Sequence, residues 1–233
     1  MKPIKPRLSS ASIPAESTAS SLLAAQSLRG RVLKRGGDIV FSLLVLSLGA
    51  PLFLLLAVLV KLSSRGSVFY CQRRIGRGYK GFGCLKFRTM RRDADRVLAS
   101  MLEADPKLRA EFERDHKLKR DPRITPLGKF LRRSSLDELP QFINVLRGEM
   151  SVVGPRPIVW DELRRYGRNM DEVLSVRPGL TGLWQVSGRN NLTYRTRVRL
   201  DLTYVRNRSF WLDLGIVLRT IGVVLLPMDR GAY

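Results

Sequence analysis

Histidine and cysteine are nearly absent from this sequence, which removes two common routes to catalysis. Its 233 residues include one histidine and two cysteines, Cys71 and Cys84, which form no CxxC pair. We therefore expect neither a disulfide framework nor a Cys/His zinc site. His116 lies in a run of charged residues, which favours a solvated side chain over a catalytic one. Acid–base or nucleophilic chemistry must then come from carboxylates, which also bind hard cations such as Mg²⁺.

Acidic residues are scarce beside the basic ones. The chain has 42 Lys and Arg residues against 20 Asp and Glu residues, a formal charge of +22. Such a surplus indicates an anionic partner: nucleic acid, a membrane surface or a phosphorylated small molecule. The sequence has no helix-turn-helix, zinc or RNA-binding signature. A membrane-tethered nucleic-acid-binding protein is therefore the weaker interpretation, and no nucleic-acid partner is expected.

Large apolar side chains are sparse at the N-terminus. Residues 1–30 are rich in Ser, Ala and Pro. We interpret them as a disordered lead and not as a signal peptide, because no continuous apolar core precedes a cleavage-like site. The rest of the chain is long enough to bury one sizeable core, with room for an attached subdomain.

Charge is missing altogether from residues 39–60, which as a straight helix would be about 33 Å long, enough to cross a bilayer. Pro51 removes a backbone donor in the middle, so the helix should break at Gly49, Ala50 and Pro51. Basic residues flank both ends, and a crossing would put one basic cluster on the wrong side. We expect a re-entrant hairpin at 31–62; a kinked spanning helix is the alternative.

Charged residues mark the edges of the apolar segments. Asp38 lies just before the uncharged run, where an acidic residue is costly unless it is paired. Lys34 or Arg35, about one turn earlier, is the expected partner. The apolar segment 210–226 contains Asp213 and Arg219, so it is a poor spanning helix and is expected to lie at the membrane interface.

Short β-prone runs follow the uncharged segment, at 68–71 and 82–87, with glycines between them. They predict one or two small hairpins. The glycines form neither a GxGxxG nor a Walker loop, so they indicate no nucleotide-binding fold. Lys86 and Arg88 alternate with Phe87, which on a strand would place both bases on one face. A solvated basic strand edge is the alternative. Helical spacing is also present at 93–104, 107–119 and 160–176.

The main candidate site lies at 134–157, where Asp137 and Glu138 are adjacent in an arginine-rich neighbourhood. Pro140 is tolerated only in the first turn of a helix or at a kink, so the next helix should begin close to Asp137. Carboxylates at that helix end would stay ionised, and phosphate would be favoured nearby. Ser135 fits a capping box with Glu138, so capping alone is the alternative. The arginines are Arg132, Arg133, Arg147 and Arg156.

A second group of polar side chains follows at 177–191, RPGLTGLWQVSGRNN. This segment has two glycine turns, an aromatic residue and several amide and guanidinium donors. Such donors suit a base, a ribose or a phosphate, although a packed turn has the same composition.

Taken in order, these motifs resemble the bacterial sugar transferases that initiate glycan assembly, the monotopic polyprenol-phosphate phosphoglycosyl transferases. The resemblance covers Arg31 to the C-terminus. Within that family, the chain is similar to the exopolysaccharide-initiating hexose-1-phosphate transferases. The motifs are KRGGD before the proline-broken run, KFRTM, DPRITPLGKFLRRSSLDELPQFINVLRGEMSVVGPRP, RPGLTGLWQVSGRN and LDLTYV.

The resemblance implies an α+β monotopic membrane enzyme on the cytoplasmic face of the bacterial inner membrane. Its hairpin would occupy 31–62, and its cytoplasmic catalytic domain, with interfacial helices, would occupy 63–233. It would transfer a hexose 1-phosphate from a UDP-hexose, with galactose or glucose expected, to undecaprenyl phosphate. UMP would leave, a covalent aspartyl-phosphosugar would form, and Mg²⁺ would be required. The product would start exopolysaccharide or related glycan synthesis.

The resemblance also assigns roles to residues. Asp137 would be the nucleophile, and Glu138 would hold the metal with it or tune the pair. Four bases match the positions that bind the diphosphate and nucleotide, and three residues match a QxxGRN loop. In two departures, Ala50 stands where the family often has Ser, and Glu149 stands where it has Asp. The bases are Lys86, Arg88, Arg132 and Arg156, and the loop residues are Gln185, Arg189 and Asn190.

Overall fold

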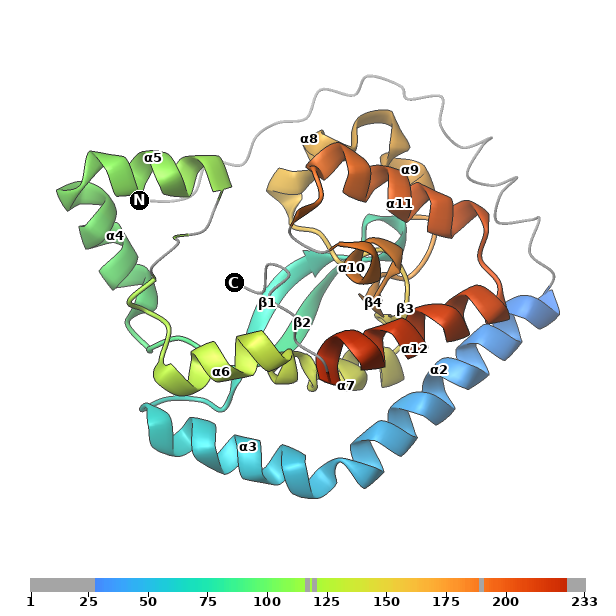
Figure 1. The fold of residues 1–233 in the computed structure, drawn as a ribbon, viewed down its shortest axis with the longest axis horizontal. Coiled ribbons are helices and arrows are strands. Elements are labelled where there is room, and N and C mark those ends of the chain that lie inside the picture. Colours follow the sequence, from blue (N-terminus) through green and yellow to red (C-terminus); the bar gives the residue numbers. More distant parts are fainter. Residues whose placement is uncertain (1–27, 116–117, 119–120, 189–190, 226–233) are drawn as a thin grey trace.

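The structure is a computed structural model that describes residues 28–115, 118, 121–188 and 191–225. Helices surround two small two-stranded sheets, so the α+β expectation is confirmed (Figure 1). Residues 1–27, most of the predicted lead, lie outside the described residues, as do His116, Arg189 and Asn190. The first helix among the described residues begins at Leu28, three residues before the predicted start of the hairpin.

Two helices, α2 (Leu28–Leu48) and α3 (Ala50–Ser63), form the lower edge in Figure 1. They are bent by 65° at the predicted break. Pro51 lies in the first turn of α3, where its missing N–H costs no hydrogen bond. A Cβ at Gly49 would lie 2.5 Å from the carbonyl oxygen of Val45, so the tight bend requires glycine. In the described part of the chain, only this bent pair together has the length and apolar character of a membrane span, and no single helix does.

The predicted β-hairpin is present. Strands β1 (Phe69–Ile75) and β2 (Gly81–Phe87) pair antiparallel around η1 (Arg77–Tyr79). Gln72 pairs with Cys84 in the register, so alternate residues on the two strands share a face. That face includes Arg74 of β1 and Lys86 of β2, and it supplies part of the site described below.

A helical arm follows the hairpin, made of α4 (Ala94–Ala104) and α5 (Pro106–Asp115), and it projects to the left in Figure 1. Both helices were predicted. The chain then returns through α6 (Pro126–Ser134), which begins where the Thr125 hydroxyl accepts a hydrogen bond from the Gly128 amide at 2.9 Å. This return leads directly into the 134–157 stretch.

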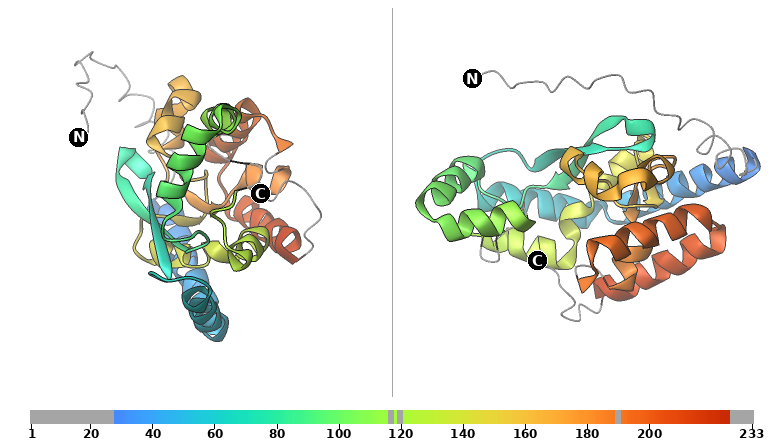
Figure 2. Two further views of the ribbon diagram at one scale, coloured as in Figure 1. Left: turned by 90° about the vertical axis from the view of Figure 1, so that its left-hand side faces the viewer. Right: turned by 90° about the horizontal axis from the view of Figure 1, so that it is seen from above.

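The centre of the molecule is built from α7 (Gln141–Leu146) and the parallel pair β3 (Ser151–Val153) and β4 (Gly179–Thr181). The β1–β2 hairpin lies on one side of this centre and the helices α11 (Tyr194–Arg206) and α12 (Phe210–Leu225) on the other (Figure 2, right). Segment 160–176, predicted as helical, is four short helical pieces. The remaining elements are η3 (Trp160–Glu162), α8 (Leu163–Tyr166), η4 (Gly167–Asn169), α9 (Met170–Val173), α10 (Leu183–Ser187), α11 (Tyr194–Arg206) and α12 (Phe210–Leu225).

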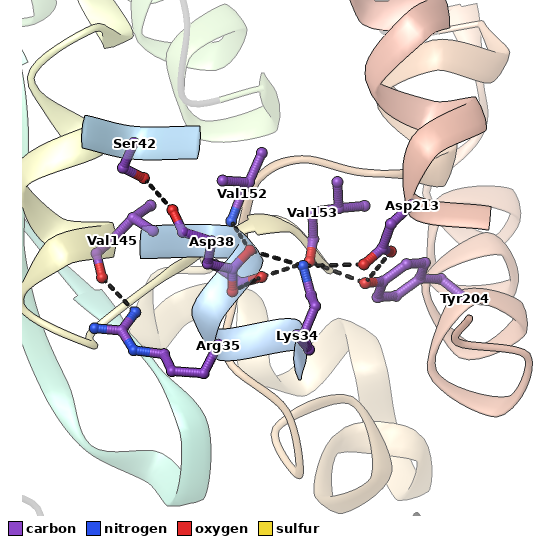
Figure 3. A network of polar contacts seen from close by, with 10 residues as sticks. Lys34, Arg35, Asp38, Ser42, Val145, Val152, Val153, Tyr204 and Asp213 are labelled. Atoms are coloured by element: carbon purple, nitrogen blue, oxygen red, sulfur yellow. Dashed lines mark hydrogen bonds and ion pairs between the residues drawn. The ribbon is translucent and has the colours of Figure 1, made fainter. Parts of the chain in front are cut away.

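Asp38 ties the bent helix pair to this centre (Figure 3). Its carboxylate, 4% exposed, accepts hydrogen bonds from Lys34 Nζ at 2.8 Å and from the Val152 amide at 3.1 Å. Of the two expected partners of Asp38, Lys34 forms the pair, whereas Arg35 donates to the Val145 and Leu146 carbonyls. Lys34 Nζ also lies 3.0 Å from Oδ2 of Asp213, on α12. One buried carboxylate and one lysine therefore join α2 to β3 and α12.

Candidate active site

Asp137 and Glu138 lie in their own 3₁₀ turn, η2 (Leu136–Glu138), between α6 and α7. Ser135 adopts a left-handed conformation at φ 58° that ends α6, and its side chain caps neither α6 nor η2. The capping-box alternative is therefore wrong. Pro140 is the N-cap of α7, so the carboxylates precede that helix instead of occupying its first turn.

Glu138 is paired with Lys86 of β2. Lys86 Nζ donates to Oε1 of Glu138 at 2.6 Å, and the two side chains are 19% and 27% exposed. Burial alone would raise the pKa of Glu138, but the charges of Lys86 and Arg156 more than offset it. Hydrogen bonds from Lys86 and Gln141 help to hold that pKa below its usual value. Glu138 therefore stays ionised to a lower pH than an ordinary glutamate does.

Asp137 behaves differently, although it is the adjacent residue. It is 7% exposed, and burial, reinforced by the Glu138 charge, raises its pKa to about 6. Lys86 and Arg132 act in the opposite direction without overcoming burial. Asp137 is therefore still mostly ionised at neutral pH, as expected, but desolvation holds its pKa above the usual value. A carboxylate that titrates just below neutral pH is typical of catalytic positions.

Arg132 is positioned beside Asp137 by the end of α6. Its Nε donates to the Thr89 hydroxyl at 2.9 Å. Burial lowers the pKa of the Arg132 guanidinium, while the charges of Asp137 and Asp121 act in the opposite direction. The predicted proximity of Arg132 to the carboxylate pair is therefore present, and the Thr89 bond fixes the direction of its guanidinium.

A narrow cleft with about 10 Å³ of free volume opens beside Glu138. Arg156 and Gln185, both expected to bind substrate, line it together with Lys86 and Glu138. Gln185 Nε2 donates to the Leu180 carbonyl at 3.2 Å, while its buried Oε1 has no partner among the described residues. An acceptor left open in this way suits a donor group on a ligand. The lining residues are Arg74, Cys84, Lys86, Glu138, Gln141, Arg156, Pro157, Gly179, Leu180 and Gln185.

Arg88 lies elsewhere, so the structure does not bring all four predicted bases together. Arg88 follows the last residue of β2; its amide still donates to the Val68 carbonyl at 2.9 Å, but its side chain does not line the cleft of Lys86. Its guanidinium donates to the carbonyl oxygen of Ser64, the C-cap of α3, at 2.5 Å and to that of Ser67 in the loop that follows. The expectation that both bases serve one site is wrong, and Arg88 instead connects the bent helix pair to the hairpin.

Arg74 lines the cleft but was not singled out as a site residue from the sequence, whereas Trp184 is the aromatic residue noted in the 177–191 segment. Arg74 Nη1 donates to the Pro157 carbonyl at 3.0 Å, and burial and the Arg156 charge both lower the pKa of its guanidinium. Trp184 carries two guanidinium groups over its ring, with Arg156 at 5.8 Å and Arg197 at 5.0 Å. Side chains alternate between the two faces of a strand, so the pairing of β1 with β2 places Arg74 on the same face as Lys86. This alternation was the sequence signal that could have predicted Arg74 near the site.

The carboxylate pair also suits a magnesium ion. Mg²⁺ is usually held by one or two carboxylates together with substrate phosphates and water. Asp137 and Glu138 are two adjacent carboxylates of η2, and among the described residues no group of three or more His, Cys, Asp or Glu side chains could hold a metal ion. Oε1 of Glu138 is already engaged by Lys86, which leaves Asp137 as the stronger candidate ligand.

Comparison with known proteins identifies the family to which this chain belongs. A family model described as bacterial sugar transferase matches residues 29–227. The chain belongs to the bacterial sugar transferase family. The motifs that carried the resemblance, from KRGGD to LDLTYV, all fall inside the matched residues.

Individual relatives match most of this chain. An uncharacterized sugar transferase of Haemophilus influenzae is 55% identical over 206 residues, which are 88% of this chain and 43% of that protein. The exopolysaccharide production protein ExoY of Sinorhizobium fredii is 50% identical over 204 residues, 88% of this chain and 89% of that protein. The undecaprenyl-phosphate galactose phosphotransferase of Salmonella typhimurium is 51% identical over 203 residues, 87% of this chain and 42% of that protein. The chain thus spans less than half of two of these relatives and most of the third.

Proposed function

We propose that this chain transfers a hexose 1-phosphate, of galactose or glucose, from the UDP-sugar to undecaprenyl phosphate and releases UMP. The observation that carries the proposal is the buried Asp137 carboxylate beside the Lys86–Glu138 pair and Arg132. The names of relatives support the substrates. One relative is an undecaprenyl-phosphate galactose phosphotransferase, and an Escherichia coli relative, 40% identical over 82% of this chain, is a UDP-glucose:undecaprenyl-phosphate glucose-1-phosphate transferase.

The first step is attack of the ionised Asp137 on the phosphorus that carries the sugar. A bond forms from the Asp137 carboxylate oxygen to phosphorus, the phosphorus–oxygen bond to UMP breaks, and UMP leaves with that electron pair. In the second step an oxygen of undecaprenyl phosphate attacks the same phosphorus, and the Asp137 carboxylate leaves. A carboxylate suits this sequence because it is both an acceptable nucleophile and a good leaving group.

The basic residues around Asp137 offset the charge of the diphosphate. Arg132 lies on the Asp137 side of the site, and Lys86 and Arg156 lie on the cleft side. Fixed cations in a buried site stabilise developing negative charge more strongly than they would in water. Magnesium, when held by Asp137 and Glu138, would add Lewis-acid neutralisation of the same phosphates.

The bent helix pair would place this site at the inner membrane. We propose that α2 and α3 form a re-entrant hairpin and that α12 lies at the interface, so that both ends of the hairpin stay on the cytoplasmic side. Exposed apolar side chains on these helices support this arrangement, since their burial in lipid is favourable. They are Val40, Leu43, Leu44, Leu48, Leu52, Leu54, Leu55, Val58, Phe210, Trp211, Leu218 and Ile221.

The test follows UMP release from membranes that contain the protein, with UDP-galactose or UDP-glucose, undecaprenyl phosphate and Mg²⁺. Wild type should release UMP, addition of EDTA should stop the release, and Asp137→Asn should be inactive although it still inserts. Asp161→Asn changes an exposed carboxylate of η3 and should retain full activity. No UMP from wild type with either donor would refute the transfer, and full activity of Asp137→Asn would refute the nucleophile.

A separate measurement addresses the topology. Single cysteines placed before α2 and after α3, in a Cys71→Ser background, can be labelled with a membrane-impermeant reagent from each side. Both sites should react only from the cytoplasmic side. Labelling of the N-terminal site from the periplasm would instead indicate a spanning helix.

A further inference from the structure

Three arginines from distant parts of the chain gather at the C-terminal end of α7, beside Gly148. Arg35 comes from α2, Arg77 from η1 and Arg177 from the segment before β4. We call them the arginine cluster. Arg35 donates through Nη1 to the Val145 carbonyl at 2.6 Å, and Arg177 donates through Nε to the Gly148 carbonyl at 2.7 Å.

Gly148 lies beside two members of the cluster, Arg35 and Arg177. It has a positive φ of 80°, and a Cβ added there would lie 3.5 Å from Nη2 of Arg35 and 4.0 Å from Nη2 of Arg177. The Nη2 atoms of Arg35 and Arg177 thus both lie beside Gly148, and Nη2 of Arg35 also donates to the Leu146 carbonyl at 3.0 Å. Guanidinium groups present planar pairs of donors that match phosphate oxygens.

Arg77 adds a third charge to the same place. The Gly78 amide, next to it, donates to the Leu174 carbonyl at 2.8 Å and so holds the hairpin turn near Arg177. The charges of Arg77 and Arg35 add to burial in lowering the pKa of the Arg177 guanidinium. Arg77 itself is exposed.

The protein does not balance this charge. In the part of the chain that the structure describes, no member of the cluster forms an ion pair. Asp38 acts on Arg177 through its charge, but its own oxygens accept hydrogen bonds from Lys34, Ser151 and Val152. Helix capping explains the carbonyl bonds of Arg35 and Arg177, since a helix C-terminus attracts cations, yet it leaves Arg77 unexplained.

The position of the cluster indicates what it binds. Arg35 precedes the uncharged run by about one turn, and Val40, the second residue of that run, is 57% exposed. If α2 and α3 enter the bilayer, as in the proposed function on which this inference rests, the cluster lies at the depth of lipid headgroups. We propose that the arginine cluster binds the phosphate group of an anionic lipid at the entrance of the hairpin.

The test measures lipid binding to the full chain in neutral detergent by native mass spectrometry. The probes are phosphatidylglycerol, polyprenyl phosphate, phosphatidylcholine and inorganic phosphate. Arg77→Gln is the main variant, because Arg77 is exposed and its loss leaves the α7 carbonyl bonds in place. Arg164→Gln is the matched control: it removes one exposed charge from α8, at the top of Figure 1 and far from α2. Equal melting temperatures would show that both variants fold.

Wild type should bind an anionic lipid in preference to phosphatidylcholine, and Arg77→Gln should bind it roughly fivefold more weakly, the effect of about one basic residue at an anionic surface. Arg164→Gln should bind as wild type does. Equal weakening in both variants would overturn the proposal, because it would indicate overall charge alone. Binding of inorganic phosphate without either lipid would also overturn it. UMP release is scored separately, so a protein that transfers sugar phosphate without a lipid preference refutes this inference and leaves the proposed function intact.

Discussion

Lys86 Nζ lies 2.6 Å from Oε1 of Glu138, so a strand of the hairpin reaches directly into the turn that carries the carboxylate pair. Because of this contact, the two neighbouring carboxylates differ in ionisation and in proposed role. It helps to hold Glu138 ionised, whereas the buried Asp137 keeps a pKa of about 6. A nucleophile and a fixed charge thus arise from adjacent residues because their environments differ.

The pH dependence of the first chemical step should report this arrangement. Because Asp137 must be ionised to attack, the single-turnover rate should fall as pH drops through about 6 and reach a plateau near neutral pH. Lys86 lowers the pKa of Asp137, so Lys86→Gln should move the acidic limb upward by roughly one pH unit. Glu138 raises that pKa, so Glu138→Gln should move the limb downward by a similar amount.

Quenched-flow measurement of UMP formation between pH 4.5 and 8.5 checks both shifts. Lys80→Gln removes an exposed lysine from the same hairpin and should leave the profile unchanged. Shifts of the same sign in the Lys86 and Glu138 variants would contradict the electrostatic account, since charges of opposite sign are removed.

The burial of Asp137 should also lower the stability of the folded protein above pH 6. The folded pKa, about 6, exceeds the usual 3.8, so the folded state loses stability as pH rises from 3.8 to 6 and the loss is complete above that window. The cost is on the order of 2–3 kcal/mol. Asp137→Asn removes the charge and should therefore melt at a higher temperature than wild type at pH 7.5.

Thermal denaturation in detergent at several pH values tests this expectation. The advantage of Asp137→Asn should shrink as pH is lowered towards 4, where wild type is itself protonated. Asp161→Asn, at an exposed position, is the control. A lower melting temperature for Asp137→Asn at pH 7.5 would show that the carboxylate is stabilised by contacts that outweigh its burial.

Sequence reasoning succeeded where a local rule decides the conformation. Pro51 disrupts any helix that would run through it, so the break near Gly49 followed from backbone chemistry alone. Lys34 lies about one helical turn before Asp38, and this spacing predicted it as one of two possible partners for the carboxylate. The family resemblance added the identity of the carboxylate pair, which local spacing left open between catalysis and capping.

The predictions that failed concern side-chain environments, which the tertiary structure determines. The pKa of Asp137 depends on burial, which no spacing in 134–157 encodes. Lys86 and Arg88 look equivalent in sequence, but the strand ends between them, and one reaches Glu138 while the other reaches the end of α3. Arg74 enters the cleft only because the hairpin register aligns its face with that of Lys86.

Asn144 should prove essential for holding α7 against the hairpin. It is fully buried, accepts a hydrogen bond from the Leu85 amide at 2.9 Å and donates to the Gly83 carbonyl at 2.7 Å and to Glu149 at 2.6 Å. Asn144→Ala leaves these groups without partners and should cost about 3 kcal/mol of unfolding free energy. Asn207→Ala, at an exposed helix end, should change it by no more than about 0.5 kcal/mol.

Denaturant or thermal unfolding in detergent measures both variants. The loss in Asn144→Ala should be accompanied by lower UMP release, since the same helix follows the turn that carries Asp137 and Glu138. An Asn144→Ala protein as stable as wild type would mean that the three bonds form only weakly in solution.

The bend between α2 and α3 should depend on Gly49. Its amide donates to the Val45 carbonyl at 2.9 Å, and a Cβ on Gly49 would lie 2.5 Å from that same oxygen, closer than van der Waals contact permits. Gly49→Ala must therefore open the bend or lose about 1–3 kcal/mol of stability. Gly36→Ala is the matched control: Gly36 lies in α2 with nothing within 4 Å of an added Cβ, so alanine should be tolerated or favoured by up to about 1 kcal/mol.

Spin labels at Val32 and Leu62, both exposed and near the two ends of the pair, measure the bend in a Cys71→Ser background. The distance between them should lengthen or broaden in Gly49→Ala and stay as in wild type in Gly36→Ala. If the helices straighten, the basic flanks move apart and Lys34 loses its place between Asp38 and Asp213, so UMP release should fall as well. An unchanged distance together with unchanged stability would show that the bend tolerates a side chain at residue 49 and that Pro51 alone maintains it.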